Sequence, residues 1–327
     1  MTDHHTSTSE DPIPNRIHAR PVRRPGAIIA ALIVLLVTAM LIHGIITNPN
    51  FEWNVVWRYL FNEHVLSGVA WTLILTFGSF LIATFLAIVL AVMRQSVNPV
   101  LKAVSWFYIW FFRGTPVYTQ LVFWGLIAVL IPKISLGIPF GPTFFSINTE
   151  EVFTAGRAAL IGLALNEAAY LSEIVRAGLE SVDKGQTEAS QALGMNRRQI
   201  MYRIVLPQAM RIIVPPMSNE AIGLLKTTSL VLAVPFPMEL QYVTNSITYK
   251  TYKPIPLLLV AAIWYLIITS ILMVIQHYLE KYFSRGFTDE AATSNGISGS
   301  SLSQSYKADK EKARRRAVEA KHLGLNA

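Results

Sequence analysis

The sequence predicts an all-α membrane protein with about six transmembrane helices, and two observations lead to this fold class. The chain of 327 residues is 52% hydrophobic but only 15% charged, with a mean hydropathy of +0.41, whereas soluble domains carry about 25% charged residues. Its apolar residues stand in long runs, as bilayer-spanning helices require. It has no cysteine, which excludes disulfides, thiolate catalysis and cysteine metal sites.

Six apolar segments are candidates for the transmembrane helices, because about 20 apolar residues are needed to cross the hydrocarbon core. Residues 27–46 carry no formal charge and no A-x-A cleavage site follows, so we expect a retained N-terminal anchor instead of a signal peptide. The other candidates are residues 69–93, a composite segment at 100–131 that Arg113-Gly114-Thr115-Pro116 interrupts, and residues 152–174, 212–234 and 256–276.

The basic residues orient these spans. With the N-terminus in the cytoplasm, 22 of the 28 Lys and Arg residues fall on the cytoplasmic side, 4 fall outside and 2 lie within spans. Cytoplasmic loops carry such an excess, so both termini are expected in the cytoplasm. The net charge of +8 then belongs to these loops and does not indicate nucleic-acid binding. We expect a polar cytoplasmic tail at residues 1–26 and a disordered, charged cytoplasmic tail at residues 288–327.

Residues 183–209 are polar and basic in an otherwise apolar chain. Asp183 and Asn196 can each cap a helix, and each is followed three residues later by a glutamine that can return a hydrogen bond. Gly194 fits the left-handed position that follows a helix, and Pro207 is expected to break the second helix. The pattern predicts a cytoplasmic helix–Gly–helix loop, although an ordinary amphipathic loop on the bilayer would show similar spacing.

The spacing within this loop resembles the EAA loop of bacterial ABC-importer permeases, whose pattern is E-A-A, three residues, G, nine residues, I, one residue, L-P. The matching residues are Glu188, Ala189, Ser190, Gly194, Ile204, Leu206 and Pro207. The one departure is Ser190 for the third alanine, which exchanges one small residue for another. In that family the loop is a coupling helix that docks on a separate ATPase subunit, so the resemblance implies ATPase coupling for these residues.

Other stretches are similar to motifs of the polar amino-acid permeases within this family. They are residues 112–120 (F-R-G-T-P-x-x-x-Q), 168–178 (A-A-Y-x-x-E-x-x-R-x-G), 184–189 (K-G-Q-x-E-A) and 225–230 (L-K-x-T-S-L). Thr227 departs from the family, which often has Asp or Asn there. The resemblance extends over residues 68–283, which we expect to form the permease transmembrane domain.

The resemblance implies the permease subunit of an importer that moves a polar amino acid across the bacterial cytoplasmic membrane, and not an enzyme. It implies four partners: an ABC ATPase subunit, an extracytoplasmic substrate-binding protein, a second permease subunit that is identical or distinct, and membrane lipid. The chain contains no G-x-x-x-x-G-K-[ST] motif. We therefore expect no cofactor on this chain, with ATP and Mg bound by the ATPase.

Polar residues within the predicted spans are candidates for the substrate pathway. Asn166, Tyr170 and Glu173 share one helix face, and a charge at the bilayer centre costs about 2.5–3.5 kcal/mol, so this face should point into the bundle. An amino acid needs partners of both charge signs. The candidates are Arg113, Thr115, Gln120, Asn166, Glu167, Tyr170, Glu173, Asn219, Glu220 and Lys226.

The sequence is also compatible with other roles for the intramembrane charges and with other functions for the chain. The intramembrane charges could serve only to pair with one another, as is expected for Arg176 and Glu180, which are four residues apart. A permease for another small zwitterion, such as an opine or a compatible solute, would share the motifs, and the motifs do not identify the amino acid. An ion channel would need the bundle but no docking loop. A membrane enzyme would need an acid–base or metal cluster, and neighbouring His4 and His5 have no third ligand nearby.

Overall fold

The computed structural model describes residues 25–138 and 141–283. The tail expected at residues 288–327 lies outside the described residues, and so does all but the end of the tail expected at residues 1–26. The chain divides into two units, one ending at Glu52 and the other beginning at Trp53.

The first unit consists of α1 (Pro25–Thr47) and the 3-10 turn η1 (Pro49–Phe51). The stretch Ile28–Thr47 has a hydropathy of 2.7 and none of it is buried. A helix that is apolar on all sides is typical of a span surrounded by lipid. The helix predicted at residues 27–46 is therefore confirmed, with boundaries within two residues of those expected.

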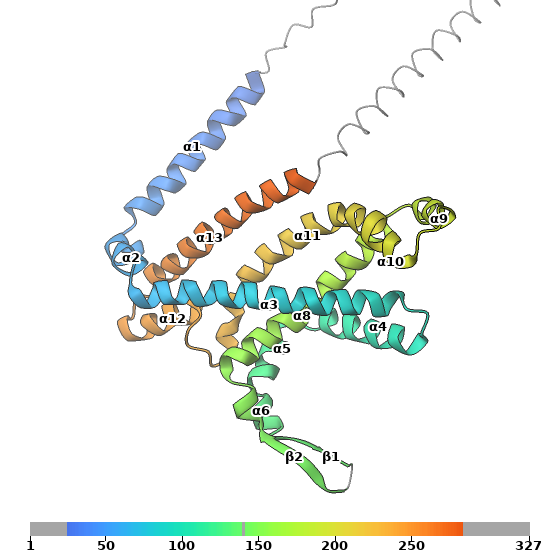
Figure 1. Cartoon of the computed structure of the whole chain (residues 1–327). Helices are drawn as coiled ribbons and strands as arrows, with labels where there is room; N and C mark the ends of the chain where they lie inside the picture. The colour runs from blue at the N-terminus through green and yellow to red at the C-terminus, as the bar shows by residue number, and fades with distance from the viewer. Residues whose placement is uncertain (1–24, 139–140, 284–327) are drawn as a thin grey trace, which may run out of the picture. The chain divides into compact units, whose positions relative to one another are not determined.

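Three long helices dominate the second unit (Figure 1): α3 (Glu63–Gln95), α8 (Ala155–Glu180) and α13 (Pro254–Phe283). With α1, they are the four described helices that are long and apolar enough to cross a membrane. They account for the first, second, fourth and sixth predicted spans. All three are longer than expected, because each helix continues past the apolar run into polar residues.

The third predicted span is built from shorter pieces. These are α4 (Pro99–Gly114), α5 (Val117–Gly125) and α6 (Ile127–Leu130). The interruption between α4 and α5 is confirmed: Thr115 is extended, with φ −115° and ψ 144°, because the following Pro116 disfavours a helical conformation at the residue before it. The apolar residues after the interruption do not form one helix, since Leu126 separates α5 from α6.

The fifth predicted span corresponds to α11 (Leu206–Thr227), which continues as the 3-10 turn η3 (Thr228–Ala233). The helix begins at Leu206, within the EAA loop at residues 183–209 and before the expected start at residue 212. It holds Pro215 and Pro216 in its interior.

Several connecting elements were not predicted. They are α2 (Trp53–Leu60), an antiparallel hairpin of β1 (Lys133–Gly137) and β2 (Thr143–Asn148), α7 (Thr149–Val152) and α12 (Leu240–Thr251). The hairpin is the one departure from an all-α fold within the described residues. Its strands are only five and six residues long, too short to stand out beside long apolar runs.

The core depends on small residues where α3 and α8 run together (Figure 1). Ala83 and Ala87 of α3 and Ala168 of α8 are completely buried in one cluster. Small side chains let two membrane helices approach closely. In addition, Ser79 Oγ donates to the Leu160 carbonyl across the contact, at 3.1 Å.

A buried carboxylate joins α3, α12 and α13. Glu239 is 0% exposed and caps α12, since its Oε2 accepts from the backbone N–H groups of Gln241 at 2.7 Å and Tyr242 at 3.3 Å. Its Oε1 accepts from Thr72 Oγ1 at 3.0 Å and from the Tyr265 hydroxyl. Both carboxylate oxygens are thus hydrogen-bonded, which makes burial of the side chain tolerable.

This network predicts that Glu239→Ala destabilises the protein. The substitution leaves the two hydroxyls and the capped N–H groups without their acceptor, at a cost of about 3 kcal/mol. Thermal unfolding of the detergent-solubilised protein should show a lower midpoint. Glu239→Gln keeps an acceptor oxygen and should lose less, while an unchanged midpoint for Glu239→Ala would show that the network contributes no stability.

Candidate functional site

A cavity of about 450 Å³ opens where the interruption between α4 and α5 faces α8 and α11. Its lining residues are Arg113, Gly114, Thr115, Pro116, Val117, Asn166, Glu167, Tyr170, Glu220, Gly223 and Thr227. Six of the ten predicted pathway residues are among them. An interrupted helix inside a membrane is found where backbone lines a cavity or is buried in protein, and this interruption does line one.

The charged side chains of the cavity interact with one another. The Arg113 guanidinium lies 5.2 Å from the centre of the Tyr170 ring, within cation–π range. Glu220 interacts electrostatically with both Arg113 and Glu167. Glu167 is 6% exposed, and its buried Oε1 forms no hydrogen bond with any described residue. The described lining therefore carries one cation and two carboxylates, of which one has an unsatisfied oxygen.

Gln120 and Asn166 hold the interruption together. The Nε2 of Gln120 donates to the carbonyls of Phe112 at 2.9 Å and Thr115 at 3.1 Å, and to Thr115 Oγ1 at 2.7 Å. Asn166 Nδ2 donates to the Phe112 carbonyl at 3.0 Å and to Gln120 Oε1 at 3.1 Å. The last carbonyls of a helix have no partner within it, and these two amides satisfy them. Gln120 is accordingly buried in the helix junction and does not line the cavity.

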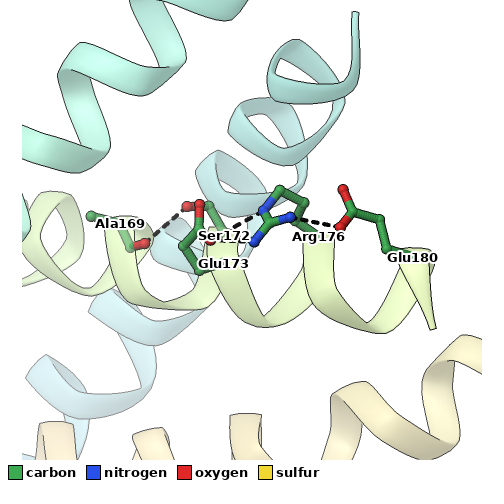
Figure 2. Close-up of polar contacts among 5 residues, drawn as sticks. All are labelled: Ala169, Ser172, Glu173, Arg176 and Glu180. Atoms are coloured by element: carbon green, nitrogen blue, oxygen red, sulfur yellow. Dashed lines mark hydrogen bonds and ion pairs between the residues drawn. The ribbon is translucent and has the colours of Figure 1, made fainter.

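Glu173 forms an ion pair on α8 (Figure 2). Arg176 bonds Glu173 Oε2 through Nη2 at 2.8 Å and Nε at 3.1 Å, and bonds Glu180 Oε2 through Nη1 at 2.7 Å. The pair expected between Arg176 and Glu180 is confirmed. Glu173 also lines a second recess, of about 490 Å³, which shares Arg113 and Tyr170 with the cavity. Of the predicted α8 face, Asn166 therefore lines the cavity, Glu173 lines the recess and Tyr170 lines both.

Two residues predicted for the substrate pathway lie apart from the cavity. Other residues line the cavity without having been predicted. Asn219 and Lys226 are exposed and do not line it. Gly223 and Thr227 of α11 do line it. The departure of Thr227 from the family motif was the available signal, whereas Gly223 carries no polar group that a search for charges would select.

The first helix of the EAA loop, α9 (Lys184–Ala192), is capped by Asp183 as predicted, but the expected return bond from Gln186 is not formed among the described residues. Asp183 Oδ1 accepts from the Gly185 N–H at 2.6 Å. At the other end, the Met195 N–H donates to the Ser190 carbonyl at 3.1 Å and the Gly194 N–H to the Gln191 carbonyl at 2.9 Å, which is the Schellman pattern. Gly194 has φ +77°, a conformation that glycine adopts without the penalty of a Cβ.

The second helix begins as predicted but does not end at Pro207. Asn196 and Gln199 form a reciprocal capping box at the start of α10 (Arg197–Ile200), with both bonds at 2.9 Å. The helix then passes through a π turn, η2 (Met201–Val205), into α11. The expected break is wrong because the wider turn, in which the Leu206 N–H donates to the Met201 carbonyl, accommodates the proline without ending the helix.

The residues of the EAA motif divide between the surface and the interior of the segment. Glu188, Ala189, Gly194 and Pro207 are exposed. Ser190 is buried, and its Oγ donates to the Gln186 carbonyl at 2.6 Å. Ile204 and Leu206 are half-buried. The segment thus presents α9 on the outside while its serine faces inward.

The helices on either side of the EAA segment touch immediately beyond it. Gly178 in the last turns of α8 is buried against α11, where an added Cβ would lie 2.2 Å from Ile213 Cγ1 and 3.4 Å from the Ala209 carbonyl oxygen. Only glycine fits this spacing without movement. The two ends of the segment are therefore held together by direct helix packing.

Comparison with known proteins identifies the family. Residues 83–285 match the binding-protein-dependent transport system inner membrane component, and this match covers more than half of the chain. The chain belongs to this family of ABC-importer permeases. It is an integral membrane transport subunit, which agrees with the apolar helices, and its relatives are transport components and not enzymes.

Individual relatives are similar over most of the chain. The arginine transport system permease protein ArgU of Corynebacterium glutamicum is 48% identical, over 84% of this chain and 85% of the relative. The histidine/lysine/arginine/ornithine transport system permease protein HisM of Escherichia coli K12 is 35% identical, over 66% of this chain and 87% of the relative. A crystal structure of an amino acid ABC transporter with histidines is 31% identical, with a TM-score of 0.56, and covers 71% of this chain and 98% of its own.

The close approach at Gly178 predicts that Gly178→Ala destabilises the packing of α8 on α11. The new methyl group must displace Ile213, and overpacking of this kind costs about 1–3 kcal/mol. Thermal unfolding in detergent measures the loss. Ile213→Ala removes the clashing atoms, so the double variant should be less destabilised than the sum of the two single variants; strictly additive losses would show that the two residues do not interact.

Proposed function

We propose that this chain is the permease subunit of an ATP-driven importer for an amino acid with a positively charged side chain. The observation that carries the proposal is the excess of carboxylate in the cavity: Glu167 and Glu220 face one cation, Arg113. An added cationic ligand would balance these charges. A neutral or acidic amino acid would leave one or more carboxylates without a counter-charge.

The arrangement suits the three charged groups of such a ligand. A guanidinium binds a carboxylate well, so Arg113 is the proposed partner of the ligand's α-carboxylate. Glu167 and Glu220 are the proposed partners of its ammonium and side-chain cation. A buried carboxylate oxygen without a hydrogen bond is costly, and the ligand would relieve that cost at Glu167 Oε1. The volume of about 450 Å³ falls in the range of small-molecule sites.

The relatives support this substrate class. Both permeases named above belong to systems whose names include arginine. The opine alternative also has support, because the nopaline transport system permease protein NocM of Agrobacterium fabrum is 33% identical over 63% of this chain. Competition for uptake by arginine, lysine, nopaline and glutamate would distinguish these ligands.

We assign ATPase docking to the exposed surface of α9, which carries Glu188 and Ala189. Gly194 and the capping box fix the angle between α9 and the helix that leads into α11. ATP and Mg would then bind the separate ATPase subunit. An extracytoplasmic substrate-binding protein and a second permease subunit complete the proposed importer, with the permease domain at residues 68–283 and the EAA loop at 183–209.

We place the chain in the bacterial cytoplasmic membrane with both termini in the cytoplasm. The support is the distribution of Lys and Arg, of which 22 fall on the same side as the EAA loop. The anchor α1 and both tails lie outside the proposed permease domain.

The first prediction of this assignment concerns coupling. Gly194→Asp adds a side chain at a left-handed position, which costs about 1–2 kcal/mol, and places a negative charge beside α9. ATP hydrolysis should continue while uptake falls, as measured in vesicles that contain the assembled transporter. Gly194→Asn has the same shape without the charge and should retain more uptake. Normal uptake by a well-expressed Gly194→Asp variant would contradict the docking role.

The second prediction concerns the cavity. Glu167→Gln should weaken arginine binding about tenfold, because it removes an ionic partner worth about 1.4 kcal/mol. Titration of arginine into the detergent-solubilised permease–ATPase complex measures the dissociation constant. Glu180→Gln is the matched control, since Glu180 is exposed and pairs with Arg176 away from the cavity. Equal affinities for the two variants would falsify the assignment of Glu167 to the substrate.

A further inference from the structure

The hairpin of β1 and β2 leaves its apolar side chains largely uncovered by the described residues, although Asn148 at its base donates through Nδ2 to Glu151 Oε1 of α7 at 2.7 Å. It projects from α6 away from the helices, at the end of α8 opposite α9 (Figure 1). Every described side chain of its strands is exposed except Ile147, which is half-buried. An isolated two-stranded hairpin is marginally stable in water, so an apolar surface on it requires support.

The strand register separates the hairpin into two faces. Ile134 pairs with Ile147 and Leu136 with Phe145, so these four side chains form one face, here called the apolar face. Lys133 pairs with Asn148 and Ser135 with Ser146 on the opposite face, here called the serine face. The two serine hydroxyls lie 3.5 Å apart, which confirms that they share a side.

The residues that precede the hairpin in the chain are also exposed and apolar. Val129 and Leu130 of α6 are 76% and 60% exposed, and Ile131 after them is 49% exposed. In the hairpin, Leu136 and Phe145 are likewise exposed, at 71% and 59%. Lys133 is the only charged residue between Ile131 and Thr149. The hairpin thus follows the third predicted span directly in the chain, with only Pro132 between Ile131 and β1.

The backbone fixes how deep such a hairpin can lie. Two strands leave the outer edge of each with unpaired N–H and C=O groups, which the hydrocarbon core does not tolerate. If the hairpin contacts lipid, it therefore lies along the membrane surface, with only its apolar face in the boundary between headgroups and acyl chains, about 5–10 Å deep. Lys133, on the serine face, can extend to the headgroups.

We propose that the hairpin is a membrane-surface anchor whose apolar face rests on lipid at the end of α8 opposite α9. A protein partner fits less well, because an ordinary protein interface uses about 20–30 residues on each side, and the apolar face offers four. The proposal does not depend on the substrate or on ATPase coupling.

The absence of cysteine from the chain allows a direct test with single spin labels. Phe145→Cys on the apolar face is compared with Ser146→Cys on the serine face, and Leu136→Cys with Ser135→Cys as an independent pair. Each full-length variant is labelled and reconstituted in vesicles of phosphatidylethanolamine and phosphatidylglycerol. Electron paramagnetic resonance then measures collision of each label with oxygen, which concentrates in lipid, and with a water-soluble nickel chelate.

We expect the ratio of oxygen to nickel accessibility to be several-fold higher at Phe145→Cys and Leu136→Cys than at the two serine positions. Equal, high nickel accessibility at all four positions would place the hairpin in water and overturn the proposal. Immobile labels at Phe145→Cys and Leu136→Cys, shielded from both reagents, would overturn it in favour of a protein partner. Neither result would bear on the cavity or on α9, so the proposed function is tested separately.

Discussion

The hydrogen bonds that Gln120 and Asn166 donate across the interruption between α4 and α5 are the constraint on which the cavity depends. A helix that ends inside the membrane exposes carbonyl groups that lipid cannot satisfy. Here the carbonyls of Phe112 and Thr115 find amide donors from α5 and α8. Because these donors come from two helices, they fix the direction of α5 relative to α4 and hold α8 against the junction. Arg113, one residue before the end of α4, thereby lines the cavity.

α8 and α11 both line the cavity and both adjoin the EAA loop. α8 carries Glu167 and Tyr170 in its middle and Gly178 near its end, while α11 carries Glu220 and begins at Leu206, within the last residues of the EAA loop. The π turn lets the second helix of the segment run into α11 without a break. Turns at residues 181–183 and 193–196 join α9 to α8 and α10, so a displacement of α9 would reach the cavity through these turns and then through α8 and α11. The direct packing of α8 on α11 at Gly178 is a physical basis for the proposed coupling.

The sequence predicts local features, such as helix caps, more accurately than it predicts where helices end or which short elements connect them. The caps at Asp183 and Asn196 and the left-handed Gly194 are as predicted, because each depends on residues a few positions apart. The end expected at Pro207 is wrong, since a proline that loses one hydrogen bond can be accommodated by a wider turn upstream. The hairpin and α12 were overlooked, because short elements between spans leave a weak pattern in a chain with long apolar runs.

The sequence by itself determined the membrane class, the positions of most long helices, the interruption before Pro116 and the family, because apolar length, proline chemistry and motif spacing are local properties. Only the tertiary structure decided which polar residues meet. It brings Arg113, Glu167 and Glu220 to one cavity, commits Gln120 to the helix junction, pairs Glu173 with Arg176, and leaves Asn219 and Lys226 exposed. The reason is that a helix face fixes a direction but not a neighbour: the partner is set by how α4, α5, α8 and α11 pack, and that depends on contacts between residues far apart in the chain.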